Sequence, residues 1–540
     1  MPRWVLALLL STAPACATPA WGGPLPESAA GRRAIRGSSV EIIHESEELR
    51  AMRAFDEQSF PRPLPGVPST GSSDDTIGSG SGSDVRHASL GNVGSDALPP
   101  PLRSPVQGEL VKPTESSSAI PWLEQIKLPD LPIRLDPRVV RYLEFYKSDR
   151  RGRAIMTSWL KKQGRWKPLF EDALRRARLP LGLVYISMIE SGFDPLDRSH
   201  AGAVGLWQFM PEGGSIYGLR IDYWIDERRN PEKATEAFAH YIGDLKERFG
   251  AWPLTLAAFN SGYGAVLRAM QKYNTNDYWE LCKHEDGLPW ETTLYVPKAM
   301  AVAIVGENKK LFGYDDVATE PPYAFDRVSV PSSMSFAAMA KAAGVSVTEI
   351  AALNPELRRN RTPPEPWQAR VPRGAGARFA AAYEQQRELV KPLVVRFGER
   401  LDDIAAAHGT SAHELRALNG IDDSAEIRPG LTLVVPDGRK PATPPPCETT
   451  IVAVPDKDET VAGRKRVFYR TLPQDSPSEI AAFFKVKPAE LAKWNNIDLD
   501  AKLASNMVLQ IWVASDFDQS KAALVDPARI RVVTTGSPEF

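Results

Sequence analysis

The chain has 540 residues, too many for one compact domain, so several domains are expected. Its formal net charge is −1, which provides no basic field to attract nucleic acid, and we predict no nucleic-acid partner. The 3 cysteines and 7 histidines form neither a disulfide framework nor a cluster with zinc-site spacing. We therefore predict no metal and no other cofactor.

The first 20 residues have the pattern of a signal peptide. Arg3 precedes an apolar run over residues 4–10, and small residues follow around residues 13–17. The run is too short to span a bilayer and is typical of a secretory signal, which predicts the periplasm or cell envelope. Cys16 follows Ala-Pro-Ala, a loose likeness to a lipoprotein cleavage box. Outer-membrane association through a lipidated Cys16 and loss of Cys16 with the signal both remain open.

Residues 21–120 are rich in Pro, Ser and Gly and lack sustained apolar periodicity. Such a segment cannot bury enough surface to offset its conformational entropy, so we predict a disordered linker. A linker of this composition would let a folded domain reach away from the envelope surface.

Helical periodicity dominates residues 121–315. Apolar side chains recur at helical spacing from Asp136 onward, and residues 233–249 form an amphipathic pattern that begins near Pro231. Another apolar helix is indicated over residues 296–305, and strand signals are nearly absent. The sequence predicts a mainly α domain here.

After residue 325 the chain repeats itself three times. In each copy a Glu lies five residues before an Asn, at Asn354, Asn419 and Asn495, and a second apolar helix precedes this stretch. The second and third copies begin and end with β-prone runs. We predict small strand–helix–helix–strand units at residues 325–375, 390–437 and 464–515, followed by a tail, 516–540, with no assigned role.

The three units resemble LysM modules, which bind glycans containing N-acetylglucosamine. The second unit is the closest match, with Asn419 in the expected Leu-Asn position, whereas the first is interrupted by the Pro-rich residues 362–366. The resemblance implies glycan binding at Asn354, Asn419 and Asn495. Packing domains without a ligand remain the alternative, above all for the first unit.

One carboxyl group stands out in the helical domain. Glu190 follows the apolar residues 183–189, so it should lie at the edge of a buried helix. A carboxyl partly removed from water keeps its proton to higher pH, as a general acid requires. The alternative is an exposed Glu at a helix end. The Gly-rich run that follows favours a site, because Trp207, Phe209 and Met210 offer apolar faces and Gln208 can hydrogen-bond a sugar.

Six separated blocks then carry a resemblance. They are Glu190-Ser191, Gly205-Leu206-Trp207-Gln208-Phe209-Met210-Pro211, Tyr217-Gly218-Leu219, Asp226-Glu227-Arg228-Arg229-Asn230-Pro231, Asn260-Ser261-Gly262, and Glu291-Thr292 with Tyr295-Val296-Pro297-Lys298. Residues 136–310 resemble the lytic transglycosylase domain of the lysozyme-like superfamily, in the arrangement of the membrane-bound murein transglycosylase D group. The implied fold is multidomain, with a mainly α lysozyme-like catalytic domain followed by small βααβ LysM modules.

The resemblance also implies an activity and its residues. Glu190 would be the sole catalytic acid/base, and the partner would be the glycan strands of peptidoglycan. The implied substrate-binding residues are Ser199, Gln208, Met210, Asn260, Glu291 and Tyr295. The implied reaction cleaves the MurNAc–GlcNAc β-1,4 bond and leaves a 1,6-anhydro-MurNAc end. A second catalytic carboxylate is not evident. Asp194 fits a turn ahead of Pro195, and neither Asp197 nor Asp226 is a stronger candidate for that role.

One departure from the family pattern bears on activity. Phe259 stands where the family usually has a Tyr, whose hydroxyl would lie near the catalytic Glu. Its work could fall to Tyr295 or Tyr263. Two other functions therefore remain open: a non-catalytic peptidoglycan-binding scaffold, and a hydrolytic muramidase of the goose type.

Overall fold

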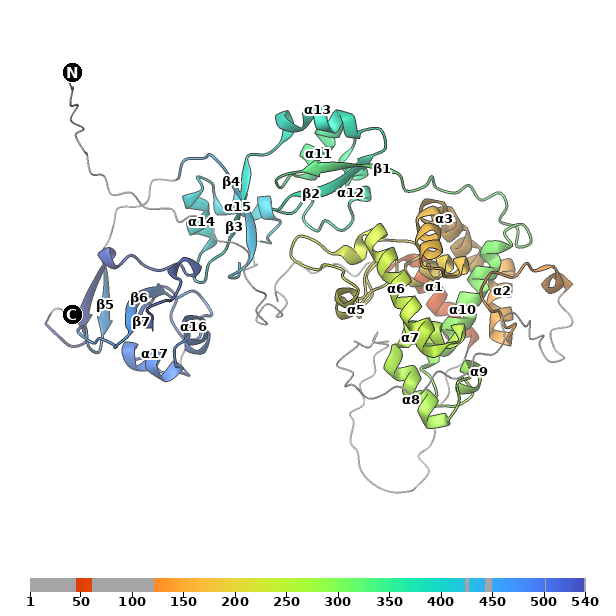
Figure 1. The fold of residues 1–540 in the computed structure, drawn as a ribbon, viewed down its shortest axis with the longest axis horizontal. Helices are drawn as coiled ribbons and strands as arrows, with labels where there is room; N and C mark the ends of the chain where they lie inside the picture. Colours follow the sequence, from red (N-terminus) through yellow and green to blue (C-terminus); the bar gives the residue numbers. More distant parts are fainter. Residues whose placement is uncertain (1–44, 61–120, 423–426, 442–448, 501, 539–540) are drawn as a thin grey trace, which may run out of the picture. The chain divides into compact units, whose positions relative to one another are not determined.

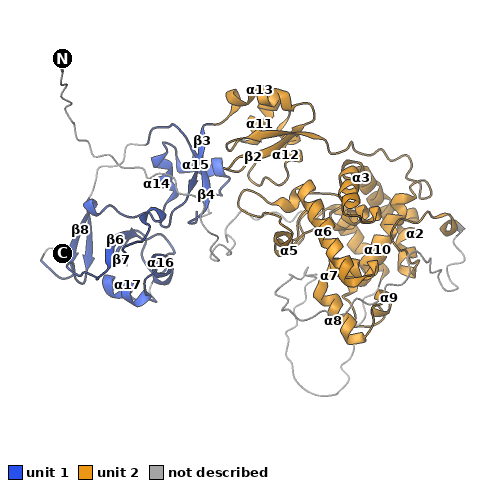
Figure 2. Cartoon of the chain, in the orientation of Figure 1, with its two compact units in different colours: residues 1–40, 389–540 blue, residues 41–388 orange. Residues whose placement is uncertain are grey.

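The computed structural model describes residues 45–60, 121–422, 427–441, 449–500 and 502–538. The chain divides into two compact units, one of residues 41–388 and one that contains residues 389–540 (Figure 2). The predicted signal peptide, Cys16 and most of the predicted linker lie outside the described residues. Across the described part, no single helix is long and apolar enough to cross a membrane, although the bent pair Phe336–Ala343 and Val347–Leu353 passes that test by length and composition.

The first unit contains the predicted helical domain (Figure 1). Its helices are α2 Pro137–Ser148, α3 Arg150–Arg176, α4 Ile186–Ser191, α5 Pro211–Ile216, α6 Pro231–Phe249, α7 Trp252–Ser261, α8 Tyr263–Tyr273, α9 Tyr278–Leu281 and α10 Trp290–Glu307. Local sequence sets several starts, because the side chains of Asp136, Asp149 and Asn230 accept hydrogen bonds from first-turn N–H groups. Helix α10 is apolar on nearly all sides and lies in the core, as such a helix must.

Helix α1, Glu47–Ser59, is a difference from the predicted disordered linker. Met52 and Phe55 are buried, and the Phe55 ring stacks on Phe145 of α2 with centroids 3.8 Å apart. The expectation for residues 21–120 is therefore wrong over this stretch. Leu49, Met52 and Phe55 form a short helical stripe, and its signal was hidden by the Pro, Ser and Gly content of the surrounding hundred residues.

Three small modules follow, each with two helices between two antiparallel strands. The first has β1 Phe325–Val330, α11 Phe336–Ala343, α12 Val347–Leu353 and β2 Trp367–Pro372; the second has β3 Val390–Val394, α14 Leu401–Ala407, α15 Ala412–Asn419 and β4 Thr432–Pro436; the third has β6 Arg464–Arg470, α16 Pro477–Phe484, α17 Pro488–Asn495 and β7 Val508–Ala514. The predicted βααβ architecture is confirmed. An additional helix, α13 Gly376–Gln386, closes the first module.

The repeated Asn has a structural role that the sequence did not reveal. In the second module Asn419 is fully buried; its Nδ2 donates to the carbonyls of Leu415 and Val434, and its Oδ1 accepts from Val434 N–H. Asn354 makes the equivalent bonds and is also fully buried, and Asn495 makes them while partly buried. These bonds fasten the second helix to the last strand. The direct glycan contact predicted for Asn354 and Asn419 is therefore wrong, because neither amide reaches the surface.

The predicted tail is folded. Strand β8, Ile530–Thr534, pairs in parallel with β5, Thr450–Val454, which precedes the third module. The side chains of Val452 and Val454 on β5 and of Val533 on β8 are buried. Removal of the tail alone would therefore expose apolar surface, so a truncation should remove the whole compact unit.

The first module is bonded to the helical domain within the same compact unit. Arg370 of β2 pairs with Glu356 and with Glu232 of α6, at 2.6 and 2.9 Å, and Asn230 Nδ2 donates to Glu356 Oε1. A backbone hydrogen bond joins Asp226 N–H to the Glu356 carbonyl at 2.9 Å.

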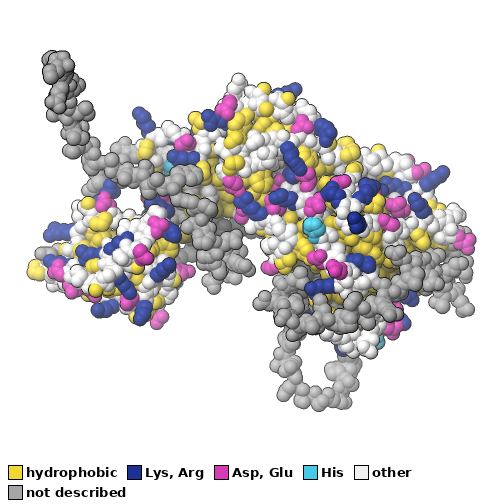
Figure 3. All heavy atoms as spheres, in the orientation of Figure 1, with side chains coloured by type: hydrophobic (Ala, Val, Ile, Leu, Met, Phe, Trp, Pro, Cys, Tyr) yellow, Lys and Arg dark blue, Asp and Glu magenta, His cyan; other side chains and the backbone are white. Residues whose placement is uncertain are grey.

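Figure 3 shows charges of both signs mixed over the visible surface, which agrees with the near-zero net charge.

Candidate active site

Glu190 lies in the last turn of α4 and is partly exposed. The preceding 3-10 helix, Leu181–Tyr185, is mostly buried, and α4 ends at Gly192 in the left-handed conformation. The hydroxyls of Ser187 and Ser191 both donate to the carbonyl of Leu206, at 2.8 and 3.1 Å. The Glu-Ser motif thus fixes the catalytic candidate to the Gly-rich loop.

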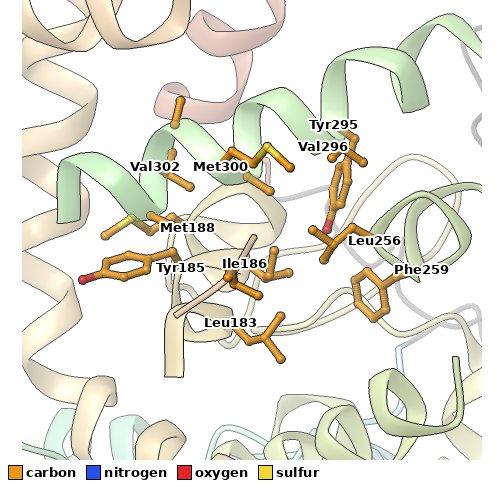
Figure 4. Packing of buried hydrophobic residues seen from close by; sticks show 14 of the residues in the cluster. Leu183, Tyr185, Ile186, Met188, Leu256, Phe259, Tyr295, Val296, Met300 and Val302 are labelled. Atoms are coloured by element: carbon orange, nitrogen blue, oxygen red, sulfur yellow. The ribbon is translucent and has the colours of Figure 1, made fainter. Parts of the chain in front are cut away.

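Tyr295 of α10 meets Glu190 across the domain. Its hydroxyl donates to Glu190 Oε1 at 2.5 Å, and its side chain is buried. Figure 4 shows Tyr295 extending from α10 toward Leu256 and Phe259 of α7. Phe259 packs against Phe238 and Tyr241 and has no hydroxyl to offer. Tyr263 instead packs against Phe249, so Tyr295 is the tyrosine that reaches the carboxyl group.

The surroundings of Glu190 change its acidity. Burial raises its pKa from 4.5 to about 7, against the opposing effects of the Tyr295 hydrogen bond and the Lys298 charge. Burial and the adjacent Glu190 carboxylate raise the pKa of Tyr295 well above its ordinary value, so the phenol stays a proton donor. A carboxyl group that is substantially protonated near neutral pH suits general acid catalysis.

Replacement of Tyr295 by Phe tests this pairing. The lost hydrogen bond stabilised the charged carboxylate, so we expect the pKa of Glu190 to rise and the alkaline limb of kcat/KM to move to higher pH. We expect kcat to fall about 10–100-fold, because the acid is no longer held in place. A pH–rate series on soluble glycan measures both effects. Tyr263→Phe is the matched control, and an equal limb shift in that variant would contradict the assignment.

The Gly-rich loop between α4 and α5 is braced from inside by Gln208. This residue has a left-handed backbone, φ +50°, and its Nε2 donates to Asp197 Oδ2 at 3.1 Å and to the carbonyls of Asp197 and Gly205. Gly205 has φ +88°, and any side chain there would collide with the carbonyl of Arg228. The loop conformation is therefore set by close packing.

Arg228 fastens the same loop from the other side. Its guanidinium forms a two-point pair with Asp226, at 2.9 and 2.7 Å, and its Nη1 donates to the carbonyls of Gly202 and Phe209. Both charged side chains are buried. In the sequence this block stands out only as part of the family resemblance. The Asp-x-Arg spacing was the available signal for the pair, but the loop carbonyls it binds could not be foreseen.

The other candidate residues fall into two groups. Ser199 Oγ accepts from Ala203 N–H at 3.0 Å, and Asn260 Oδ1 accepts from Thr292 Oγ1 at 2.8 Å, so both are held by neighbours. Met210 and Glu291 are partly exposed at the starts of α5 and α10. A substrate contact remains a prediction for all of these and for Gln208.

Two aromatic residues lie elsewhere than predicted. Trp207 is fully buried; its ring stacks on Phe238 with centroids 3.7 Å apart, and its Nε1 donates to Thr235 Oγ1. Phe209 is also buried. The apolar sugar-binding face predicted for Trp207 and Phe209 is therefore wrong, because both rings complete the core beneath the loop.

Among the described residues no group of three or more His, Cys, Asp or Glu could hold a metal ion.

The helical domain carries a carboxyl group of raised pKa and is followed by small βααβ modules. This combination is typical of enzymes that act on cell-wall glycans, and known protein families agree with it. Residues 168–282 match the transglycosylase SLT domain. Residues 324–388 match the LysM-like domain described for lytic transglycosylase MltD, and residues 393–436 and 469–512 match the LysM domain. The predicted resemblance is confirmed: the chain carries a transglycosylase SLT domain, an MltD-type LysM-like domain and two LysM domains, and these matches indicate a lytic transglycosylase.

Two relatives agree in sequence with the family matches. The chain is 29% identical over 343 residues to membrane-bound lytic murein transglycosylase D of Escherichia coli K12, covering 60% of this chain and 71% of that protein. The protein of the same name from E. coli O6:H1 matches equally. Among solved structures, lytic transglycosylase Slt of Pseudomonas aeruginosa is 22% identical with a TM-score of 0.23, covering 28% of this chain and 25% of that one.

Proposed function

We propose that the chain cleaves the MurNAc–GlcNAc β-1,4 bond of peptidoglycan and leaves a 1,6-anhydro-MurNAc end, with Glu190 as its single acid/base. The pairing of Glu190 with Tyr295 carries the proposal, because it joins a carboxyl group of raised pKa to a fixed hydrogen-bond donor. It also favours an enzyme over a non-catalytic scaffold, since Tyr295 supplies the hydroxyl that Phe259 lacks.

The carboxyl group of Asp197, which interacts electrostatically with Glu190, argues against a two-carboxylate hydrolase. Asp197 is buried, and its two oxygens accept from Ser46 N–H and from Gln208 Nε2. Burial and the neighbouring Asp194 raise its pKa to about 8, so it is mostly uncharged at neutral pH. An uncharged, internally bonded carboxyl is a poor nucleophile or base for the second half of a hydrolytic cycle.

The proposed cycle uses one proton. Protonated Glu190 donates to the bridging oxygen as the bond from that oxygen to C1 of MurNAc breaks. The substrate acetamide shields the oxocarbenium-like carbon. The Glu190 carboxylate then takes the proton of the C6 hydroxyl while O6 bonds to C1, so no water is consumed and Glu190 is restored. Because O6 belongs to the same sugar, positioning supplies much of the acceleration.

The decisive experiment is digestion of purified sacculi followed by mass spectrometry of the released muropeptides. Products with anhydro-MurNAc ends, lighter by one water than hydrolytic products, would support the transglycosylase mechanism. Reducing ends would identify a muramidase, and no release would favour the scaffold.

The LysM modules are proposed to hold the enzyme on cell-wall glycan in the cell envelope. The named relatives are membrane-bound, and a lipidated Cys16 is the corresponding proposal for this chain. Mass spectrometry of the mature N-terminus tests it, and an unmodified Cys16 or its loss would exclude it.

Removal of residues 389–540 should weaken retention on sacculi at least about tenfold, because two modules leave together. Turnover of short soluble glycan should change little, since Glu190 and its partners lie in the other unit. The whole unit is removed because β8 pairs with β5. A sedimentation assay measures retention, and a loss of turnover with unchanged retention would contradict the anchoring role.

A further inference from the structure

Helix α1 contacts several parts of the catalytic domain at once. Near its start, Ser46 N–H donates to Asp197 Oδ1 at 3.3 Å, and Glu48 accepts from Ser158 Oγ of α3 at 2.5 Å. Near its end, Asp56 accepts from the Tyr142 hydroxyl of α2 at 2.7 Å and pairs with Lys298 of α10 at 2.5 Å. Figure 1 shows α1, in red, beside α3 and α10.

The two ends of α1 reach two flanks of Glu190. Asp197 at one end holds Gln208 and with it the Gly-rich loop. Lys298 at the other end lies one turn after Tyr295 on α10, and Tyr295 donates to Glu190. The Asp56–Lys298 pair is largely buried, with the two side chains 9% and 15% exposed. Such a pair is costly to break and fixes the geometry of the helices that carry it.

We propose that α1 is part of the active site of this enzyme, and that Asp56 is a positioning residue that acts on Glu190 through Lys298. The proposal rests on Glu190 being the acid/base. It means that the catalytic unit begins near residue 45 and includes a helix that is separated by about sixty residues from the rest of the domain.

The electrostatic coupling can be stated group by group. Glu190 faces Tyr295 and Lys298 from α10 and, from the loop, Asp197, which in turn faces Asp194 and Glu45. The Lys298 charge lowers the pKa of Glu190. The Asp56 carboxylate offsets the Lys298 charge at close range. Neutralising Asp56 should therefore let Lys298 lower the pKa of Glu190 further.

Asp56→Asn in the full chain tests this directly. We expect the alkaline limb of kcat/KM to move about 0.5–1 pH unit lower, with kcat reduced and KM nearly unchanged. Glu47→Gln is the matched control, because it removes one carboxylate from the exposed face of the same helix. It should leave both the melting temperature and the pH profile at the wild-type values.

The double variant Asp56→Asn with Lys298→Met covers the case in which the single variant fails to fold, because it leaves no unpaired charge. With Lys298 gone, its alkaline limb should move above that of the wild type. A lower melting temperature with wild-type pH limbs in both variants would reduce α1 to a structural brace and overturn the proposal. Full activity of Glu190→Gln would instead overturn the proposed function, so the two failures are distinguishable.

Discussion

Glu190→Gln is expected to lower muropeptide release from sacculi about 10²–10⁴-fold, because glutamine has no proton to give to the bridging oxygen. Tyr295 can still donate to the amide oxygen, so the site should keep its shape. Sacculus binding should remain at the wild-type level, since the two LysM-family domains at residues 393–436 and 469–512 lie in the other compact unit. Product analysis and sedimentation of the same samples measure both properties.

The matched control is Glu212→Gln, which neutralises an exposed carboxylate at the start of α5. It should release muropeptides at the wild-type rate. Continued release by Glu190→Gln would show that another group supplies the proton and that Glu190 is misassigned.

Glu190→Gln should also alter the pH dependence of the free energy of unfolding. The pKa of Glu190 is 4.5 ordinarily and about 7 in the folded protein, so the unfolded chain releases this proton first as pH rises. The free energy of unfolding of the wild type therefore falls between pH 4.5 and about 7 relative to Glu190→Gln. The advantage of the variant should reach about 1–3 kcal/mol above pH 7 and decline toward pH 4. Thermal melts at the two pH values measure it, and a pH-independent difference would contradict the raised pKa.

Arg228→Ala should have the largest effect on folding, about 3–5 kcal/mol of unfolding free energy. It leaves Asp226 buried without its two-point partner and frees the carbonyls of Gly202 and Phe209. Hydrogen bonding and the charge of Arg228, together with the charges of Arg229 and Arg358, keep the pKa of Asp226 low despite its burial, so the variant leaves a buried carboxylate without its direct partner. Thermal or urea denaturation measures the loss.

Arg176→Ala is the control for Arg228→Ala. Arg176 also pairs with two carboxylates, Asp172 and Glu236, but all three side chains are exposed. Its removal should cost about 0–1 kcal/mol. Equal losses in the two variants would contradict the special role of the buried pair.

The sequence alone determined the order of the domains, their helical or βααβ character and the candidate Glu190. These features are local: helical periodicity, capping residues and short motifs are complete within a few turns of chain, so they can be recognised without the fold. The repeated Asn position was also visible, but its structural role was not. Whether an amide faces a ligand or closes a helix onto a strand depends on what packs over it, as Asn419 shows.

Only the tertiary structure decided the features that depend on residues far apart in the chain. Asp56 meets Lys298 across 242 positions, β8 pairs with β5, and Tyr295 reaches Glu190 across 105 positions. Such contacts leave no periodic trace in the sequence. The pKa of Glu190 is likewise a property of the fold, because burial raises it while Tyr295 and Lys298 oppose that rise, and all three effects exist only once the helices have packed.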